Sequence, residues 1–309
     1  MNVLILGRGG QVALELAAAL WPAGLVPVIA GRPEFDMARP ETLEPVLERA
    51  GAGVVINATA YTAVDQAETE ASLAFAINRD GPARLAELCH HRGVPVLHIS
   101  TDYVFDGTKA GPYGEDDPVA PLGVYGASKE AGEAAVRALA PRHVILRTSW
   151  VYSVHGQNFV KTMLRLGAER DELRVVADQH GAPTAAADIA AALVRIAAAG
   201  VQTAVAGVQA AVAGTGQELP WGTYHYTGEG VTTWHGLAEH IFAAQQRASG
   251  RRPRLVPIPS ADYPTPARRP ANSRLECSRI GHAFGIAGRP WREGVDEVLA
   301  RLLPGSRRP

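Results

Sequence analysis

The feature that most constrains the fold of this chain is an alternation of short apolar runs and longer amphipathic stretches in its first half. Five runs rich in β-branched residues or leucine are bounded by glycine, proline, asparagine or serine: residues 3–6, 26–30, 54–56, 94–99 and 144–146. Runs of this kind are typical of parallel strands that are buried on both faces. The stretches between them carry apolar residues at helical spacing: residues 11–20, 40–49, 68–90 and 124–139. The alternation predicts an α/β fold with a doubly wound, Rossmann-like parallel sheet, which binds ligands beyond the carboxyl ends of its strands.

Composition excludes several other classes of protein. The formal net charge is −1, and no nucleic-acid-binding motif is present, so we expect no nucleic-acid partner. Cys89 and Cys277 form neither a disulfide framework nor a zinc set, which is typical of a reducing cytoplasm. The apolar start is too short for a signal sequence, and charged residues interrupt the alanine-rich stretch 185–199. We therefore expect a cytoplasmic protein without a membrane span.

A glycine-rich loop follows the first predicted strand directly. Gly7, Gly10 and Ala13 fit the spacing GxxGxxA, whereas GxGxxG fails because Val12 occupies its last position. Glycines at these positions allow a tight turn and let backbone N–H groups approach a pyrophosphate at a helix N-terminus. Because the loop lies between a strand and a helix, it favours a dinucleotide site over a plain turn.

The end of the second predicted strand discriminates between NAD and NADP. An acid there binds the ribose 2′-hydroxyl of NAD, whereas arginine accommodates the 2′-phosphate of NADP. Here Gly31 is followed by Arg32, with no acid immediately at the strand end. We expect Arg32, helped by Arg8, to favour NADPH, with NADH still possible. The alternative is that Arg32 is a solvated loop charge.

The second half of the chain is more mixed and is expected to form a smaller C-terminal lobe that binds substrate. We assign residues 1–150 to a Rossmann-like NADP-binding domain, which can also recruit segments around 173–199. Residues 151–309 are assigned mainly to the lobe. It is expected to contain helices near 159–166, 186–198 and 234–246 and strands near 173–176 and 224–227. The alanine- and glycine-rich segment 200–216 is interpreted as a surface insertion.

Tyr125 and Lys129 are separated by one helical turn at the start of the predicted helix 124–139. A free tyrosine has a pKa of about 10, and a nearby ammonium is expected to lower it and make the phenol usable for proton transfer. Lysine is scarce in this chain, where only Lys109, Lys129 and Lys161 stand among 30 basic side chains. An isolated pair would be read as a surface feature, but Thr101 ends a predicted strand where it can bind a substrate carbonyl beside the tyrosine.

Several longer motifs accompany these residues. They are NATAYTAVDQAE at 57–68, STDYVF at 100–105, RTSWVY at 147–152, DQHGAPT at 178–184 and PTPARRPANS at 264–273. Together with the tyrosine–lysine pair they resemble the extended short-chain dehydrogenases/reductases and, more narrowly, the dTDP-4-dehydrorhamnose reductases. The resemblance covers about residues 1–303 and is poorest at 200–216.

The resemblance implies reduction of the C4 ketone of dTDP-4-dehydro-β-L-rhamnose by NADPH, which gives dTDP-L-rhamnose. It implies that Tyr125 protonates the forming alkoxide, Lys129 holds the nicotinamide ribose and Thr101 orients the carbonyl. The cofactor positions that it implies are Gly10, Gln11, Val12, Asp36, Met37, Ala60, Tyr61 and Thr62. The substrate positions that it implies are Asp102, Trp150, Asn158 and one of Arg268 and Arg269.

Members of the resembled family that bind Mg²⁺ at a dimer contact use carboxylates for it. Glu15 matches one of these, whereas the other falls near Ala187, with Asp188 beside it. We therefore doubt the Mg²⁺ site and expect no metal, although a homodimer remains open. Lys161 is either near substrate or on the surface, and Lys109 is expected to be solvated.

Two other functions remain open. The first is another extended-family enzyme acting on nucleotide sugars, an epimerase or a dehydratase. A dehydratase typically has Thr-Asp-Glu, whereas Tyr103 follows Thr101 and Asp102 here. The second is a non-catalytic NADP-binding regulatory subunit resembling that of methionine adenosyltransferase, which has no chemical need for an intact threonine, tyrosine and lysine.

Overall fold

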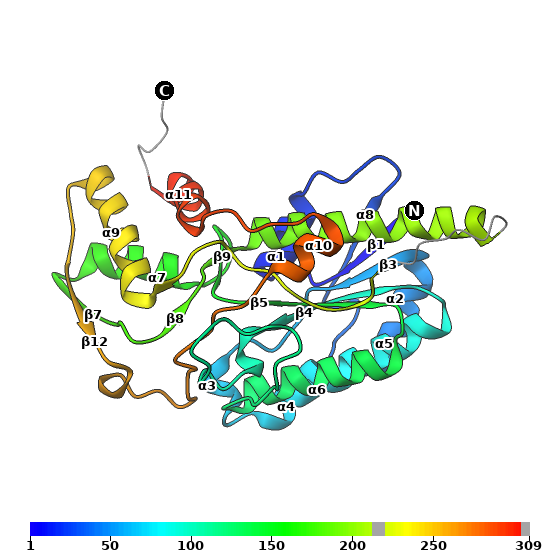
Figure 1. Ribbon diagram of the computed structural model, residues 1–309, viewed down its shortest axis with the longest axis horizontal. Coiled ribbons are helices and arrows are strands. Elements are labelled where there is room, and N and C mark those ends of the chain that lie inside the picture. The colour runs from blue at the N-terminus through cyan, green and yellow to red at the C-terminus, as the bar shows by residue number, and fades with distance from the viewer. Residues whose placement is uncertain (212–219, 304–309) are drawn as a thin grey trace.

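A six-stranded parallel sheet forms the centre of the computed structural model, which describes residues 1–211 and 220–303 (Figure 1). In spatial order the strands are β10 (Gly222–His225), β5 (His143–Thr148), β4 (Val96–Thr101), β3 (Ala52–Asn57), β1 (Asn2–Leu6) and β2 (Val26–Ala30). The chain adds β2 on one side of β1 and β3 on the other. The sheet therefore reverses its strand order at β1, which is where doubly wound folds bind their ligands.

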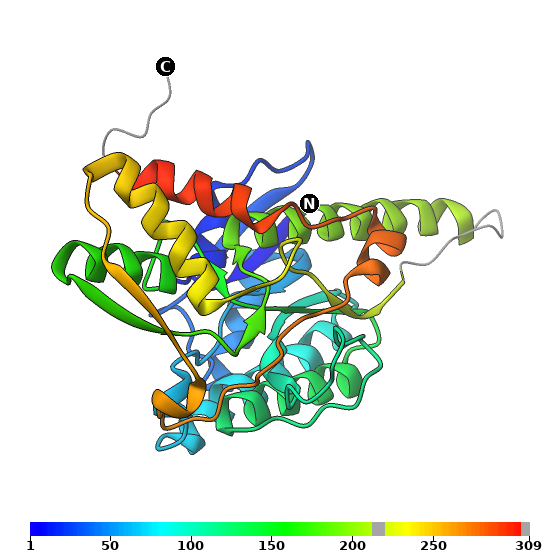
Figure 2. The same cartoon turned by 60° about the vertical axis from the view of Figure 1, so that its left-hand side comes forward.

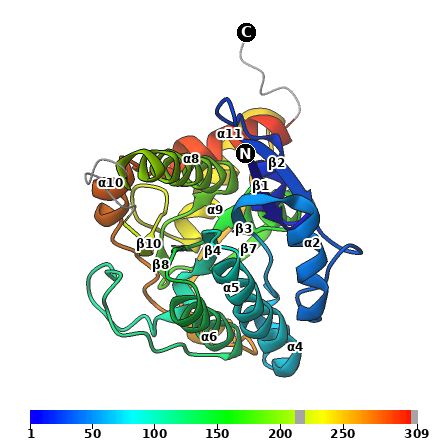
Figure 3. The same cartoon turned by 90° about the vertical axis from the view of Figure 1, so that its right-hand side faces the viewer.

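Helices cover both faces of this sheet, as Figure 3 shows. On one face lie α1 (Gln11–Ala18) and α8 (Ala186–Ala211), and on the other lie α2 (Leu43–Ala50), α5 (Gly81–His91) and α6 (Val124–Leu139). Alternate residues of β1 divide between the two cores: Val3 and Ile5 pack with α1 and α8, whereas Leu4 and Leu6 pack with α2 and α5. Burial on both faces explains why these strands are continuously apolar.

The C-terminal lobe lies beside the carboxyl ends of the central strands (Figure 2). Its helices are α7 (Phe159–Glu169), α9 (Trp234–Ser249) and α11 (Trp291–Leu302), which share a core that includes Met163, Phe242 and Val295. Three two-stranded sheets complete it: β7 (Glu172–Val176) with β12 (Arg254–Ile258), β8 (His180–Gly181) with β11 (Thr232–Thr233), and β6 (Val151–Tyr152) with β9 (Thr184–Ala185). In the described residues, no helix has both the length and the apolar character needed to cross a membrane.

The doubly wound parallel sheet is confirmed, but three expected segments differ in detail. The strand expected near 224–227 is β10, and it joins the central sheet beside β5, although it lies far beyond residue 150. Helix α8 likewise continues to Ala211, through most of the expected insertion 200–216, and the remainder of that insertion lies outside the described residues. The third is the amphipathic stretch 68–90, which is broken.

A π-helical turn interrupts the stretch 68–90. Helix α4 (Ala71–Phe75) leads into the π turn (Ala76–Asp80), and α5 begins at Gly81 with Pro82 in its first turn. Asn78 is 1% exposed within this turn, and its amide binds groups outside the helix. A π turn within a helix is frequently found at a functional site. Asn78 contacts Tyr61 and Ser128, whose chain neighbours line the cavity described below.

Helix α6 packs very closely against the segment that follows β4 and against the π turn. A Cβ atom at Gly126 would lie 2.1 Å from the carbonyl oxygen of Tyr103, and one at Gly132 would lie 2.0 Å from that of Asn78. No side chain fits at these distances, so both positions require glycine for the helix to approach. This approach places the first two turns of α6 beside the end of β4.

A buried ion pair joins the same helix to β5. Glu133 is 0% exposed, and its carboxylate accepts hydrogen bonds from Arg147 Nε (2.9 Å) and Nη2 (2.6 Å). Arg147 is itself 2% exposed, and the pair holds the pKa of the Glu133 carboxyl below its usual value against the effect of burial. Glu133 also accepts from Nη1 of the more exposed Arg137 at 2.9 Å. Since the Arg147 guanidinium does not reach water, it depends on Glu133 for its counter-charge.

We expect Glu133→Gln to lower the free energy of unfolding by about 3 kcal/mol, because it leaves the Arg147 guanidinium buried without a counter-charge. Urea denaturation at neutral pH measures the change. The matched control is Glu130→Gln on the same helix, whose partly exposed carboxylate pairs with Arg137 at 3.2 Å. The control is expected to cost less than about 1 kcal/mol. Equal losses in the two variants would contradict the structural role of the buried pair.

Candidate active site

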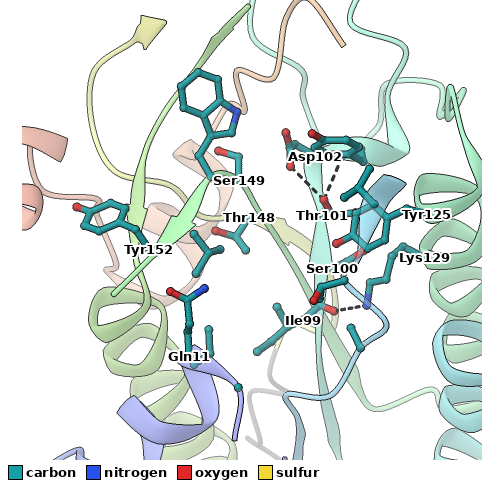
Figure 4. A pocket seen from close by; sticks show the side chains of 18 of the residues that line it. Gln11, Ile99, Ser100, Thr101, Asp102, Tyr125, Lys129, Thr148, Ser149 and Tyr152 are labelled. Carbon is teal, nitrogen blue, oxygen red and sulfur yellow. Dashed lines mark hydrogen bonds between the residues drawn. The ribbon is translucent and has the colours of Figure 1, made fainter. Parts of the chain in front are cut away.

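A cavity of about 500 Å³ opens at the carboxyl ends of β1, β3, β4 and β5, between the sheet and the lobe (Figure 4). The sheet side contributes Gly10, Gln11, Val12, Ala58, Thr59, Ala60, Thr62 and residues 99–103, with Tyr125 and Lys129 from α6. The opposite side contributes residues 148–152 and, from the lobe, Gln157, Phe159, Val160, Trp234 and Leu237. The cavity therefore lies at the strand-order reversal and has walls from both parts of the molecule.

Tyr125 lies in the first turn of α6, and its side chain extends into this cavity (Figure 4). Its ring packs edge-on against that of Tyr103, with 5.5 Å between centroids. Burial raises the pKa of Tyr125 to about 12, and its hydrogen bond with Thr101 opposes this only in part. The sequence-based expectation of a lowered pKa is wrong for this state, because removal from water outweighs any ammonium nearby. Tyr125 is therefore a phenol, a proton donor, at neutral pH.

Lys129 lies one turn further along α6 and is 2% exposed. Its Nζ donates to the carbonyl oxygen of Ile99 at 2.8 Å and lies 3.4 Å from Nε2 of His98. Burial lowers the pKa of Lys129 to about 8, with the charge of Glu133 acting in the opposite direction. Burial and the charge of Lys129 also keep the pKa of His98 well below its usual value, so that this imidazole is neutral.

Thr101 and Asp102 form the end of β4 and the start of a 3₁₀ turn (Asp102–Val104). Thr101 Oγ1 donates to Asp102 Oδ1 at 3.0 Å and accepts from the backbone N–H of Tyr103 at 3.2 Å. Asp102 is 2% exposed, and burial raises its pKa to about 6. No hydrogen bond reaches its second oxygen, Oδ2, in the described part of the chain, although Ser273 lies near enough to the carboxyl to oppose the rise in its pKa. A buried acceptor of this kind indicates a ligand group that would complete it.

Two tryptophans form a flat apolar wall on the other side of the cavity. The rings of Trp150 and Trp234 stack with 3.6 Å between centroids and 8° between planes. Trp150 adopts a φ of 48°, which is rare for a bulky residue. A Cβ at Gly181 would lie 2.5 Å from its ring, so that glycine makes room for the indole. Backbone strain of this kind is found at functional sites, where the surrounding structure imposes it.

The glycine loop has the geometry of a phosphate-binding turn. Gly7 has a φ of +127°, and a Cβ there would lie 3.2 Å from the carbonyl oxygen of Ala58. Gly10 caps the N-terminus of α1, so free N–H groups point toward the cavity. Gln11 Oε1 accepts from Nδ2 of Asn158 at 2.9 Å. Asn158 in turn caps α7, which ties the loop directly to the lobe.

The end of β2 carries an acid that the sequence analysis did not consider. Glu34 folds back over a turn, and its carboxylate accepts from Arg8 Nη2 at 2.8 and 2.9 Å and from the N–H of Gly31 at 3.2 Å. Arg32 is exposed at the same turn. In the sequence, the only indication was that Glu34 follows the strand end closely. The turn after β2 brings its carboxylate back to the N–H of Gly31.

The other predicted cofactor positions divide into two groups. Ala60 and Thr62 line the cavity, whereas the side chain of Tyr61 turns away and donates to Glu70 Oε2 at 2.8 Å. Asp36 and Met37 lie outside the cavity lining: Asp36 Oδ1 accepts from the N–H of Ala38 at 3.0 Å, and Met37 packs against Gly81.

Asn78 holds the loop after β3 against α6 and was not predicted. Its Oδ1 accepts from the N–H of Tyr61 at 2.8 Å, and its Nδ2 donates to Ser128 Oγ at 3.0 Å. Ser128 lies between Tyr125 and Lys129 in the chain. A single buried amide therefore connects a cavity wall with the helix that carries the tyrosine and the lysine.

The two C-terminal arginines behave differently. Arg269 binds the Asp65 carboxylate through Nη1 and Nη2, both at 2.7 Å, and lowers the pKa of that carboxyl. It thereby fastens the segment after β12 to helix α3 (Val64–Ala67). Arg268 is exposed.

The acids considered for Mg²⁺ each face a different nitrogen-bearing side chain. Glu15 Oε1 lies 3.7 Å from His155 Nε2, and Asp188 Oδ2 accepts from Arg289 Nε at 2.8 Å. In residues 1–211 and 220–303, no group of three potential His, Cys, Asp or Glu ligands is gathered.

The remaining two lysines lie outside the cavity lining. Lys161 Nζ donates to the carbonyl oxygen of Val154 at 3.1 Å. Lys109 is not simply solvated, as the sequence analysis expects, because it forms an ion pair with Asp117. Lys129 is therefore the buried, cavity-facing lysine among the three that the chain contains.

The fold, the glycine cradle and the tyrosine–lysine pair beside a strand-end threonine define an oxidoreductase of the extended short-chain dehydrogenase/reductase class, which uses a nicotinamide dinucleotide. The chain belongs to the family described as the RmlD substrate binding domain, which matches residues 1–303. A curated relative, dTDP-4-dehydrorhamnose reductase of Sinorhizobium fredii, is 45% identical over 303 residues, which cover 98% of each chain.

Solved structures of similar proteins agree with this assignment. The dTDP-4-dehydrorhamnose reductase of Clostridium acetobutylicum is 33% identical with a TM-score of 0.84 and covers 98% of this chain and 99% of its own. That of Bacillus anthracis, solved in complex with NADP, is 32% identical with a TM-score of 0.83 and covers 97% and 99%.

Lys129 is expected to titrate near pH 8 in the free protein, charged below that pH and neutral above it, because burial disfavours its ammonium. Carbon-13 labelling at lysine Cε gives only three signals, which NMR can follow through a pH titration. The variants Lys109→Arg and Lys161→Arg assign the other two signals and leave the cavity intact. A Lys129 signal that titrates near pH 10.4, as in a free lysine, would contradict its enclosure.

Proposed function

We propose that the protein reduces the C4 ketone of dTDP-4-dehydro-β-L-rhamnose with NADPH and releases dTDP-L-rhamnose. The observation that carries the proposal is the placement of a protonated tyrosine, a buried lysine and a strand-end threonine around one cavity beside the glycine loop. Membership of a family whose curated relatives bear this reductase name supports it further.

The residues of this chain supply position and a proton. NADPH, when bound, supplies the hydride that adds to C4. Tyr125 donates its phenolic proton to the ketone oxygen, which becomes the hydroxyl, and is reprotonated from solvent. Thr101 orients the same oxygen by donating its hydroxyl proton to it, for which the hydroxyl turns away from Asp102 Oδ1. A raised tyrosine pKa suits this direction of reaction, because reduction requires the protonated form.

Lys129 has two roles in the proposal. Its ammonium stabilises the phenolate that Tyr125 becomes, and it donates to the nicotinamide ribose. A compact ammonium suits both roles, whereas the larger, planar guanidinium does not fit this geometry. Gly10, Gln11 and Val12 present N–H groups to the pyrophosphate, and Ala60 and Thr62 form the neighbouring wall.

The sugar nucleotide lies between Asp102 and the tryptophan wall in the proposal. Asp102 Oδ2, which has no partner of its own in the described chain, accepts from a sugar hydroxyl. Trp150 offers the sugar its apolar face. Because Asp65 already holds Arg269, the exposed Arg268 is the favoured cation for the diphosphate.

The other readings are less well supported. The 3₁₀ turn that follows Thr101 carries Asp102 and Tyr103, without the second acid of a dehydratase. A regulatory subunit would not need a buried lysine beside a proton-donating tyrosine. We also infer a cytoplasmic location and a homodimer. Sedimentation would test the homodimer directly.

Tyr125→Phe is expected to reduce turnover by at least about a hundredfold, because general acid catalysis is lost. The loss of NADPH absorbance with enzymatically prepared dTDP-4-dehydrorhamnose measures turnover, and fluorescence titration measures NADPH binding, which should be unchanged. The matched control is Tyr113→Phe, which removes a hydroxyl that donates to Asp106 Oδ1 at 2.7 Å. Tyr113 lies outside the cavity lining. Turnover near that of the unmodified protein in Tyr125→Phe would refute the proton donor. Intact NADPH binding with no oxidation by the unmodified protein would favour the regulatory reading.

A further inference from the structure

A row of buried polar side chains leads from β3 through β4 to Lys129 on α6. Asn57 ends β3 and lies beside His98 of β4 in the register of the two parallel strands, and both residues are 0% exposed. Nδ2 of Asn57 lies 3.0 Å from Nδ1 of His98, and Nε2 of the same imidazole lies 3.4 Å from Nζ of Lys129. His98 therefore stands between a strand-end amide and the lysine of the cavity.

Thr59 fixes the orientation of the Asn57 amide. The backbone N–H of Thr59 lies 3.1 Å from Oδ1 of Asn57, and its Oγ1 lies 2.6 Å from the same atom. Since a backbone N–H can only donate, the atom that it contacts has to be the amide oxygen, and the remaining amide atom is the nitrogen. The N–H groups of Asn57 therefore point to His98.

This orientation selects one tautomer of His98. Nδ1 faces a donor and must offer its lone pair, so the single proton of a neutral imidazole is on Nε2. An imidazolium would set N–H against N–H at Asn57. Burial, the charge of Lys129 and that of His143 on β5 also keep the pKa of His98 well below its usual value. His98 consequently presents an Nε2–H to Lys129.

The two forms of Lys129 meet this N–H differently. The amine has a lone pair that accepts from Nε2–H of His98, while it donates to the carbonyl oxygen of Ile99 at 2.8 Å (Figure 4). The ammonium has donors alone, so N–H faces N–H across 3.4 Å. His98 thus stabilises the amine relative to the ammonium, in the same direction as burial.

The other groups near Lys129 do not reverse this effect. The carboxylate of Glu133, one turn further along α6, favours the ammonium, but Arg147 on β5 and Arg137 already bind that carboxylate. Tyr125, in the preceding turn of α6, is an uncharged phenol at neutral pH. With burial and these charges together, the pKa of Lys129 is lowered to about 8.

We propose that His98, held in its Nε2–H tautomer by Asn57, is a positioning residue that directs this N–H at Lys129 Nζ and so weakens the hold of the lysine on its proton. The inference rests on the proposed function only for the use of that lysine in the reaction. A loosely held proton makes the ammonium a stronger hydrogen-bond donor to the phenolate that Tyr125 becomes. Groups that take part in proton transfer also work best when their proton affinity matches the operating pH.

The tautomer is tested in the unmodified protein, without cofactor or nucleotide sugar. In a protein labelled with nitrogen-15 at histidine, NMR distinguishes a protonated ring nitrogen from a bare one, and His98→Gln identifies the His98 signals by their absence. We expect a neutral ring with its proton on Nε2 at neutral pH. A proton on Nδ1, or on both ring nitrogens, would overturn the proposal.

The effect on Lys129 is tested with two substitutions of His98. Glutamine can accept from Asn57 and donate to Lys129, whereas methionine fills the space without an N–H. Carbon-13 NMR at lysine Cε should show the pKa of Lys129 rising by about one pH unit in His98→Met and changing by less than about half a unit in His98→Gln. Removal from water predicts the opposite sign for methionine, the more apolar neighbour.

The matched control is His143→Met on β5, which replaces a buried histidine that contacts the carbonyl oxygen of Ala140. It should leave the Lys129 signal in place. Asn57→Leu gives a second route to the same result, because His98 Nε2 is then free to accept from the ammonium, and the pKa of Lys129 should rise again. An unchanged or lowered pKa in His98→Met and Asn57→Leu, or equal values in the methionine and glutamine variants, would overturn the positioning role.

Turnover separates this inference from the proposed function. Oxidation of NADPH with dTDP-4-dehydrorhamnose should decline at alkaline pH as the ammonium is lost, and in His98→Met the decline should move to higher pH together with the Lys129 signal. If the signal responds as expected but the unmodified protein does not oxidise NADPH, the positioning role stands and the reductase falls. If the unmodified protein reduces the sugar and the signal ignores His98→Met, only the positioning role is overturned.

Discussion

The close packing of α6 against the 3₁₀ turn after β4 and against the π turn is the contact on which the rest of the site depends. Two glycines, Gly126 and Gly132, let the helix approach to distances that no side chain would permit. The buried Glu133–Arg147 pair then fastens the helix to β5 at the same level. Because the helix lies so close, Tyr125 and Lys129 lose their water, and this loss sets the pKa of each. Packing thus determines the chemistry that the two side chains can perform.

The same arrangement explains why the cavity needs both parts of the chain. The sheet supplies the glycine loop and the strand ends, whereas the lobe supplies Trp234 and positions Trp150 against it. Polar links cross between the parts, among them Asn158 with Gln11 and Arg269 with Asp65. Arg269, which sequence similarity places at the substrate, thus holds helix α3 at the wall of the cavity.

Much of the fold was predictable, because burial on both faces of a parallel sheet leaves a local pattern in the sequence. Helix α6 and the strand-end position of Thr101 followed from that pattern. Glu34 was not predictable, since only the turn after β2 returns it to the strand end. The π turn around Asn78 and the stacking of Trp234 on Trp150 depend on partners distant in the sequence. The pKa of Tyr125 was predicted in the wrong direction because enclosure by tertiary structure, rather than the neighbouring lysine, dominates it.

The fate of the transferred hydride tests the central claim most directly. NADPH deuterated at the transferring position of its nicotinamide is incubated with dTDP-4-dehydrorhamnose and stoichiometric protein, and the sugar is analysed by NMR and mass spectrometry. Net reduction at C4 predicts one deuterium at that carbon of the dTDP-rhamnose formed and one equivalent of NADP⁺. An altered sugar without deuterium, formed with no net oxidation of the cofactor, would contradict the reductase and indicate an epimerase.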